Sequence, residues 1–308
     1  MSGSALARVT KVNSDLRVNK AAATAAATAP LCTGPRASAA RAATLSADIA
    51  RALRGRAGSI AIRVEDQWSW VECRYNEGRR FHSASVVKVT ILAALLRRHQ
   101  ENHTSMTNWE YGQAQQMIED SNNTAATNLW NDVGRSWFQH FLNVASMTET
   151  IPGPGGYWGL TQITARDELQ QLRLLTGANN VLSNSSRSYE LGLMNHVISS
   201  QRWGTPYGAP SGLTVYVKNG WLPDPSLWVI NSLGAFQGHG RNYMITVLTS
   251  GNSSMTYGVN TIQSISWWVH HDLNAGRTPA GTPLRAVVIP AAQQRPDEFI
   301  PASAYGHQ

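Results

Sequence analysis

The sequence predicts an α+β fold in which one antiparallel sheet, flanked by helices, is interrupted by an all-helical subdomain. Segments with the alternating pattern of strands occur early in the chain and return only in its last third. Between them, from about residue 97 to residue 197, apolar residues recur with the helical period. Strands that are distant in sequence must therefore meet in one sheet, with the helical segment inserted between them.

The first part of the chain is predicted to form a helix and a hairpin before the helical segment begins. Residues 45–53 have the helical period. Residues 59–64 and 68–74 have strand character, and the short turn at 65–67 joins them as a hairpin. A further helix follows directly over the apolar run 86–96.

The middle of the chain is predicted to be helical. A loop rich in proline and glycine over residues 151–159 separates two pairs of helices. The predicted helices cover residues 117–130, 137–144, 164–176 and 188–198.

Strands return after residue 213. Residues 214–218, 227–236 and 242–249 are predicted strands, and the last two are joined by a turn at Gly238-His239-Gly240. An amphipathic helix over residues 256–273 closes the domain.

These elements predict one folded domain between two tails. Residues 1–42 form a basic, alanine-rich tail, and residues 276–308 form a proline-rich extension. The domain, residues 43–275, is expected to have an α/β part at about 43–96 and 212–275 and a helical part at about 97–211.

Composition restricts the class of protein. The chain has 308 residues, of which 42% are hydrophobic and 15% charged, as in a globular protein. Its net charge of +7 arises in the first 60 residues, which hold nine Lys or Arg and two acids; the remainder is neutral. No basic stripe with interleaved aromatic residues occurs there, so nucleic-acid binding is not predicted. No run of 18 apolar residues occurs either, so no membrane span is predicted.

The cysteines and the N-terminus bear on the compartment. Cys32 and Cys73 are the only cysteines, and without a CxxC pair they predict neither a zinc ribbon nor a thioredoxin-type site. They form either one disulfide or two buried thiols. The N-terminus lacks the apolar core of a signal peptide, so the protein is cytosolic or its leader has been removed or replaced.

No cofactor and no metal site is predicted. His270, His271 and Asp272 are adjacent in a predicted helix and therefore point in different directions. The glycine-rich segment 153–159 lacks the spacing of a phosphate-binding loop.

Lysine is rare in this chain and marks candidate catalytic positions. The sequence has 22 arginines and four lysines, of which Lys11 and Lys20 lie in the tail and Lys88 and Lys218 in the domain. Arginine stays protonated, whereas a partly buried lysine can lose its proton and act as a base. Ser85 lies three residues before Lys88, on the same face of a helix. A nucleophile beside a base is a catalytic arrangement.

Three motifs occur in a fixed order. Ser85-Val86-Val87-Lys88 begins a helix, Ser121-Asn122-Asn123 follows a helical segment, and Lys218-Asn219-Gly220 ends a strand. The series SxxK, SxN and KxG is the motif set of penicillin-interacting serine enzymes. The sequence resembles the class A β-lactamase-type serine hydrolases, in the superfamily of penicillin-binding proteins and DD-peptidases. Residues 81–92, 120–127 and 164–167 carry this resemblance, which covers about residues 43–275.

The resemblance implies a role for each motif residue. Ser85 would be the nucleophile and Lys88 the base that takes its proton. Ser121 would relay a proton to the departing nitrogen. Asn123 would hold Lys88 and bind the amide of the substrate side chain. Lys218 would bind the substrate carboxylate and tune Ser121.

The resemblance also implies an oxyanion site, formed by the backbone N–H groups of Ser85 and of Trp221, just after Gly220. Two positions depart from the family pattern. Asn219 stands where a hydroxyl residue is usual, although its amide can still donate to a carboxylate. No ExxLN segment follows the second motif, and Glu149 is the only acid between residues 134 and 163, so it is the candidate base for deacylation.

For the whole protein the resemblance implies a monomer that acts on a small β-lactam or a peptidyl amide. It also implies a secreted or extracytoplasmic protein in which Cys32 and Cys73 are bridged. Three functions remain open: a β-lactamase, a DD-peptidase-like or biosynthetic acyl-transfer enzyme, and a non-catalytic binder of β-lactams or peptidoglycan fragments.

Overall fold

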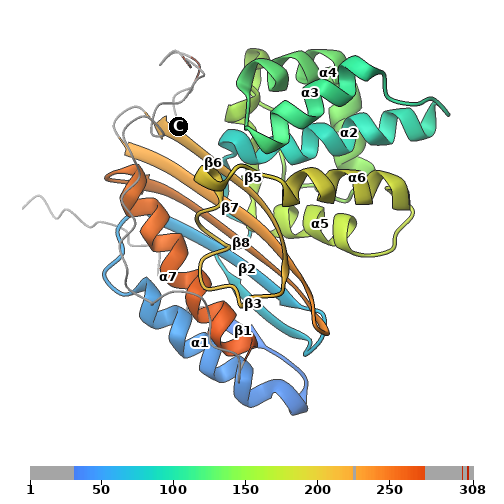
Figure 1. The fold of residues 1–308 in the computed structure, drawn as a ribbon. Helices are drawn as coiled ribbons and strands as arrows, with labels where there is room; N and C mark the ends of the chain where they lie inside the picture. Colours follow the sequence, from blue (N-terminus) through green and yellow to red (C-terminus); the bar gives the residue numbers. More distant parts are fainter. Residues whose placement is uncertain (1–30, 225–226, 275–299, 301–303, 305–308) are drawn as a thin grey trace, which may run out of the picture.

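The centre of the fold is a six-stranded antiparallel sheet in the order β1-β3-β2-β8-β7-β6 (Figure 1). The computed structural model describes residues 31–224, 227–274, 300 and 304. The strands are β1 (Leu31–Thr33), β2 (Ser59–Asp66), β3 (Val71–Tyr75), β6 (Thr214–Asp224), β7 (Leu227–Gly238) and β8 (Arg241–Asn252). The predicted meeting of early and late strands is confirmed, because β2 pairs with β8 along its whole length.

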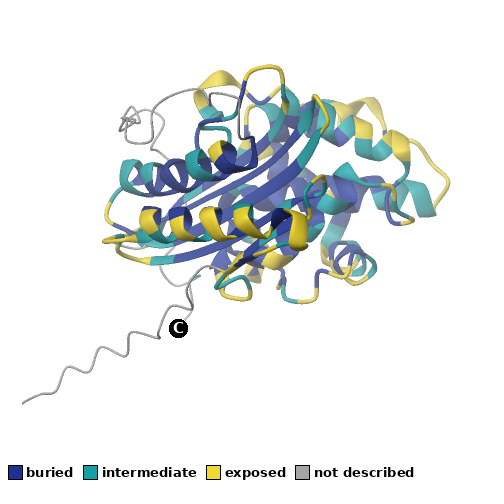
Figure 2. Ribbon diagram, turned by 90° about the horizontal axis from the view of Figure 1, so that it is seen from below, coloured by how far each residue is buried: buried dark blue, intermediate teal, exposed yellow. Residues whose placement is uncertain are grey.

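Both faces of the sheet are covered, as the alternation of side chains along a strand requires. Ile245 and Val247 of β8 pack with helices α1 (Ala39–Leu53) and α7 (Met255–Leu273), which lie side by side in Figure 1. Met244 and Leu248, which point the other way, join the core shared with the helical part. Figure 2 shows the central strands buried and the outer faces of flanking helices exposed.

The helical part lies against the face of the sheet opposite to α1 and α7 and reaches from β6 across β7 and β8 to β2 (Figure 1). Its helices pack around α2, whose residues 87–96 are all buried. A two-stranded sheet of β4 (Arg80–His82) and β5 (Gln162–Thr164), which the sequence did not predict, lies at its base. The helices are α2 (Val87–Glu101), α3 (Asn108–Glu119), α4 (Asn123–Val144), α5 (Ala165–Thr176) and α6 (Asn184–Asn195). Among the described residues, no helix has the length and apolar character needed to cross a membrane.

The predicted helix over residues 117–130 is wrong. The chain leaves the helix after Glu119 and re-enters it at Asn123, where the Asn122 side chain caps α4 by accepting a hydrogen bond from Ala125 N at 2.8 Å. Ser121, between the two helices, has a positive φ of 58°. The apolar period continues across the break, which is why the pattern alone did not reveal it.

The ordered fold begins earlier than residue 43. Strand β1 adds to the sheet edge beside β3, and α1 begins at Ala39 rather than at residue 45. A disulfide joins Cys32 to Cys73, which are paired across β1 and β3. Of the two alternatives for the cysteines, the disulfide is the one observed. The proline-rich segment 276–299 lies outside the described residues.

Helix α5 buries an acid that the fold keeps protonated. The Glu168 side chain is fully buried, and neither of its carboxylate oxygens has a hydrogen-bond partner among the described residues. This desolvation, together with the nearby charge of Asp167, raises the pKa of Glu168 to about 8. The neutral form is therefore the stable one in the folded protein at pH 7.

We expect Glu168→Gln to stabilise the protein at neutral pH. The unfolded chain releases the Glu168 proton near the ordinary glutamate pKa of 4.5, whereas the folded chain retains it up to a pKa of about 8. Stability conferred by the protonated acid is thus complete below pH 4.5 and is lost as the pH rises towards 8. Over this window the wild-type free energy of unfolding should fall relative to the variant, by about 3 kcal/mol at pH 7. Urea unfolding of both proteins at pH 4.5, 6 and 8 measures the difference, and a constant difference would contradict the prediction.

Candidate active site

The candidate nucleophile lies in a strained turn at the start of a helix. Ser85 is the central residue of a short 3-10 helix, η2 (Ala84–Val86), that continues into α2. Ala84, directly before it, has a positive φ of 47°, an unfavourable conformation for a residue with a Cβ. Such strain persists only where the surroundings enforce it.

The sheet holds this turn through Asn231 of β7, which is fully buried. Its side-chain amide donates to the backbone oxygens of His82 at 2.8 Å and Ser83 at 3.2 Å. Its Oδ1 accepts from the backbone N of Thr249, on the neighbouring strand β8, at 3.2 Å. Asn231 therefore fixes the segment before Ser85 to two strands of the sheet.

Gly220 brings strand β6 into close contact with the same turn. A Cβ at this position would lie 2.8 Å from both the backbone N of Ser85 and the backbone O of Ser83. Real Cβ atoms do not approach backbone so closely, so only glycine fits here. The third motif thus places β6 against the nucleophile.

Lys88 is fully buried and fully engaged. Its amine donates to the backbone O of Ser121 at 2.6 Å and to Asn123 Oδ1 at 2.5 Å, and contacts Ser121 Oγ at 3.2 Å. The face of the Trp158 ring covers it, with 4.8 Å between Nζ and the ring centroid. Three oxygen atoms therefore surround the amine, and Ser121 Oγ is the most distant of them.

Ser121 lies between the two buried lysines. Lys218 Nζ donates to Ser121 Oγ at 2.8 Å, from the side opposite to the helical part. A serine hydroxyl has two acceptor sites and one hydrogen. With both acceptor sites facing amines, the Ser121 hydrogen is free to point at a third group.

Lys218 projects from β6 into the site and is fully buried. Burial lowers the pKa of Lys218 from 10.5 to about 7. This amine therefore changes its charge near neutral pH, and an anion bound beside it would favour the charged form.

Asn219 points to the other side of the strand. Its side-chain amide donates to the backbone oxygens of Gln201 at 2.7 Å and Trp203 at 2.8 Å. It therefore anchors the segment that leads into β6. Trp221 follows on this edge strand, and its ring packs against Trp203 with centroids 5.9 Å apart.

Glu149 is not brought into this cluster. Its carboxylate accepts from Thr164 Oγ1 at 2.9 Å and forms an ion pair with Arg166. Its backbone O accepts from Arg80 Nε at 3.0 Å, at the start of β4. The hydrogen bond and ion pair of the Glu149 side chain are thus to Thr164 and Arg166, and not to Lys88 or Ser121.

Sequence reasoning missed the supporting contacts. Asn231 lies in a strand of apolar residues, where a single buried amide is the one available signal. Trp158, in the loop over residues 151–159, is buried, and its Nε1 donates to Thr127 Oγ1 at 3.1 Å.

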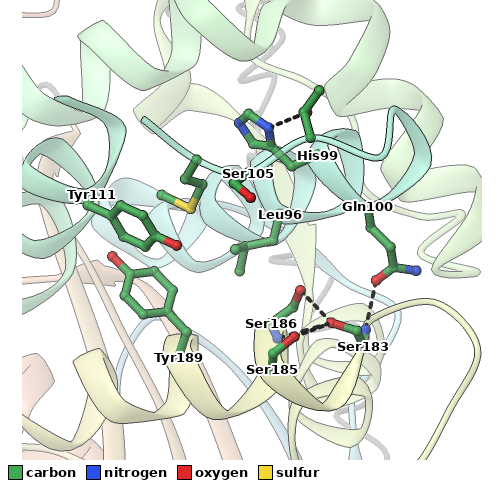
Figure 3. Close-up of a pocket in the computed structure, with 11 residues that line it drawn as sticks. Leu96, His99, Gln100, Ser105, Tyr111, Ser183, Ser185, Ser186 and Tyr189 are labelled. Carbon is green, nitrogen blue, oxygen red and sulfur yellow. Dashed lines mark hydrogen bonds between the residues drawn. The ribbon is translucent and has the colours of Figure 1, made fainter. Parts of the chain in front are cut away.

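A separate cavity of about 380 Å³ lies near the C-terminal end of α2, lined in part by Leu96, Tyr111 and Tyr189 (Figure 3). Because α2 has 15 residues, this cavity is roughly 20 Å from the Ser85 end of the helix. It is distinct from the serine–lysine cluster.

Comparison with known proteins identifies the family. A family model described as the β-lactamase enzyme family matches residues 44–109 and 113–272. This chain belongs to that family. The comparison with curated protein sequences gave no match.

Solved structures of β-lactamases and of a PBP-A mutant have the same fold. A β-lactamase from Xanthomonas campestris pv. campestris aligns with a TM-score of 0.64 at 19% identity, covering 75% of this chain and 97% of that one. TLA-3 extended-spectrum β-lactamase aligns with a TM-score of 0.66 at 16% identity, covering 75% of this chain and 98% of that one. A PBP-A mutant, solved as an acyl-enzyme complex with penicillin G, aligns with a TM-score of 0.64 at 19% identity. The alignment covers 75% of this chain and 96% of that one.

We expect Asn231→Ala to destabilise this β-lactamase-family fold strongly. The change would remove three buried hydrogen bonds, at a cost of about 2–3 kcal/mol in the free energy of unfolding. Asn143→Ala is the matched control, because Asn143 is exposed and its side chain accepts from Gln139 on the same helix. Urea unfolding compares the two, and equal losses would contradict the role of Asn231.

Proposed function

We propose that this protein is a serine hydrolase that forms an acyl-enzyme on Ser85 with β-lactams or related amides and releases the product slowly. The observation that carries the proposal is the placement of the Ser121 hydroxyl between two buried lysine amines, next to the turn that presents Ser85. Membership of the β-lactamase family supports the same reaction class.

In this mechanism Lys88, as a neutral amine, takes the proton of the Ser85 hydroxyl as Oγ attacks the carbonyl carbon. The backbone N–H groups of Ser85 and Trp221 stabilise the oxyanion. When the carbon–nitrogen bond breaks, the free hydrogen of Ser121 passes to the leaving nitrogen, and an amine beside it restores the proton. A carboxylate on the substrate binds beside Lys218, while Asn123 holds Lys88 and meets the substrate amide.

Deacylation lacks an evident base. Hydrolysis of the ester needs a water activated by a group within hydrogen-bond reach. In the segment from α4 to β5 the single acid is Glu149, whose carboxylate is held by Arg166 and Thr164. The face of the Trp158 ring covers Lys88. We therefore do not assign Glu149 the role of base.

The lack of an evident water-activating base also favours a second function. If water is poorly activated, the ester can pass to an amine acceptor, as in a DD-peptidase-like or biosynthetic acyl-transfer enzyme. A non-catalytic binder is the remaining alternative, and it would form no ester on Ser85. For either enzyme we propose an exported protein, because the chain has a disulfide and disulfides persist mainly in oxidising compartments.

Lys88→Arg should abolish acylation of Ser85 while the fold remains. Arginine keeps the positive charge but cannot give up its proton. Loss of the base should slow formation of the adduct by at least about 10²-fold. Stopped-flow measurements with a fluorescent penicillin test this, and thermal unfolding confirms that the variant is folded. Acylation near the wild-type rate would show that Lys88 is not the base.

With benzylpenicillin, we expect a long-lived adduct on Ser85 and weak turnover. Glu149→Gln should lose little further turnover, because absent base assistance already costs roughly 10²–10⁴-fold. A mass-spectrometric time course measures the adduct, and Ser85→Ala is the control that should form none. Rapid turnover that collapses in Glu149→Gln would instead indicate a working base at Glu149. No adduct in the wild-type protein would favour a binder.

A further inference from the structure

One described residue of the C-terminal extension, Ile300, belongs to the same apolar cluster as Ala84, the residue before Ser85. Ile300 is nearly buried, with 9% of its surface exposed, although it lies 28 residues beyond residue 272, the last that the family model matches. It packs in a small apolar cluster that is separate from the two main cores of the domain. The buried members of this cluster are Ala84, Leu160, Leu222, Val229 and Ile300.

The cluster adjoins the groups that would react. Ala84 is the residue before Ser85, and Leu222 is the residue after Trp221 on β6. Leu222 also lies two positions after Gly220, hence on the same side of the strand, roughly 7 Å further along. Gly220 lies against the backbone N of Ser85, so this part of β6 adjoins the turn that contains Ser85. Ile300 packs in the apolar cluster beside that turn, which we call the apolar wall.

The apolar wall packs around Ala84, whose backbone conformation is strained. Ala84 holds a φ of 47° with its side chain 3% exposed, so its Cβ is enclosed by the cluster. Asn231 holds the preceding residues by hydrogen bonds to His82 and Ser83, but these bonds do not reach Ala84 itself. Backbone hydrogen bonds from Ser83 N to Thr161 O and from Val86 N to Ser83 O also flank Ala84. Packing around the Ala84 methyl group adds to these contacts, and Ile300 belongs to that packing from outside the residues that the family model matches.

We propose that Ile300 is a positioning residue for Ser85. It holds Ala84 in the conformation that presents the Ser85 hydroxyl and N–H, and so makes acylation depend on the C-terminal extension. Ala304, which is partly buried, packs against the same cluster and extends the contact. The proposal rests on the proposed function for its kinetic consequence, but its structural part does not.

The test compares Ile300→Ala and Ile300→Val with Ile49→Ala in the full chain. Ile49 is a buried residue of α1, in the core on the opposite face of the sheet, and controls for loss of stability alone. We expect Ile300→Ala to slow acylation by a fluorescent penicillin by about tenfold or more, because small misplacements of reacting groups cost up to about 10²-fold. Ile300→Val should retain most of the wild-type rate. Ile49→Ala should lower the melting temperature without changing the rate.

A second readout needs no substrate. Hydrogen–deuterium exchange in a peptide covering residues 83–87 should be faster in Ile300→Ala and unchanged in Ile49→Ala. If the wild-type protein forms no adduct, the proposed function fails and the exchange experiment alone decides the role of Ile300. Unchanged exchange, an acylation rate equal to that of wild type, or faster acylation in Ile300→Ala would each overturn the proposal; the last would indicate an inhibitory contact.

Discussion

The two lysine amines on either side of Ser121 constrain much of the surrounding structure. Burying an ammonium without partners is costly, so each amine must find oxygen acceptors nearby. Lys88 finds them in the break between α3 and α4, where Ser121 adopts a positive φ and Asn123 begins the next helix. Lys218 reaches the same hydroxyl from the sheet. One hydroxyl thus joins the helical part to the sheet and fixes how the two meet at Ser121.

Contacts from the surrounding elements also fix the turn that contains Ser85. The turn at Ala84 and Ser85 is held by Asn231 on one flank, touched by the bare backbone of Gly220 on another, and packed by the apolar wall that includes Ile300. Each contact comes from a different element. A site of this kind tolerates little change in side-chain size around Ser85, even at positions that never touch a substrate.

Much of this could be predicted from the sequence because the chemistry depends on a few unusual residues. The scarcity of lysine pointed to Lys88 and Lys218, and the fixed order of three motifs pointed to Ser121. Element periodicity gave the sheet and its helical interruption. The break at Ser121 was missed because apolar periodicity runs across it. Asn231 and Ile300 were missed because a lone amide in a strand, or a lone isoleucine in a proline-rich segment, has no spacing that reveals its partner.

The bond between Lys218 and Ser121 joins residues 97 positions apart. Contacts of such long sequence separation require a large loop to close before they contribute any stability, which places them late in folding. A ribosome-bound chain that ends before β6 has Ser85 and Lys88 but lacks the second amine and the edge strand. Ser85 therefore acquires these neighbours only after β6 has been synthesised.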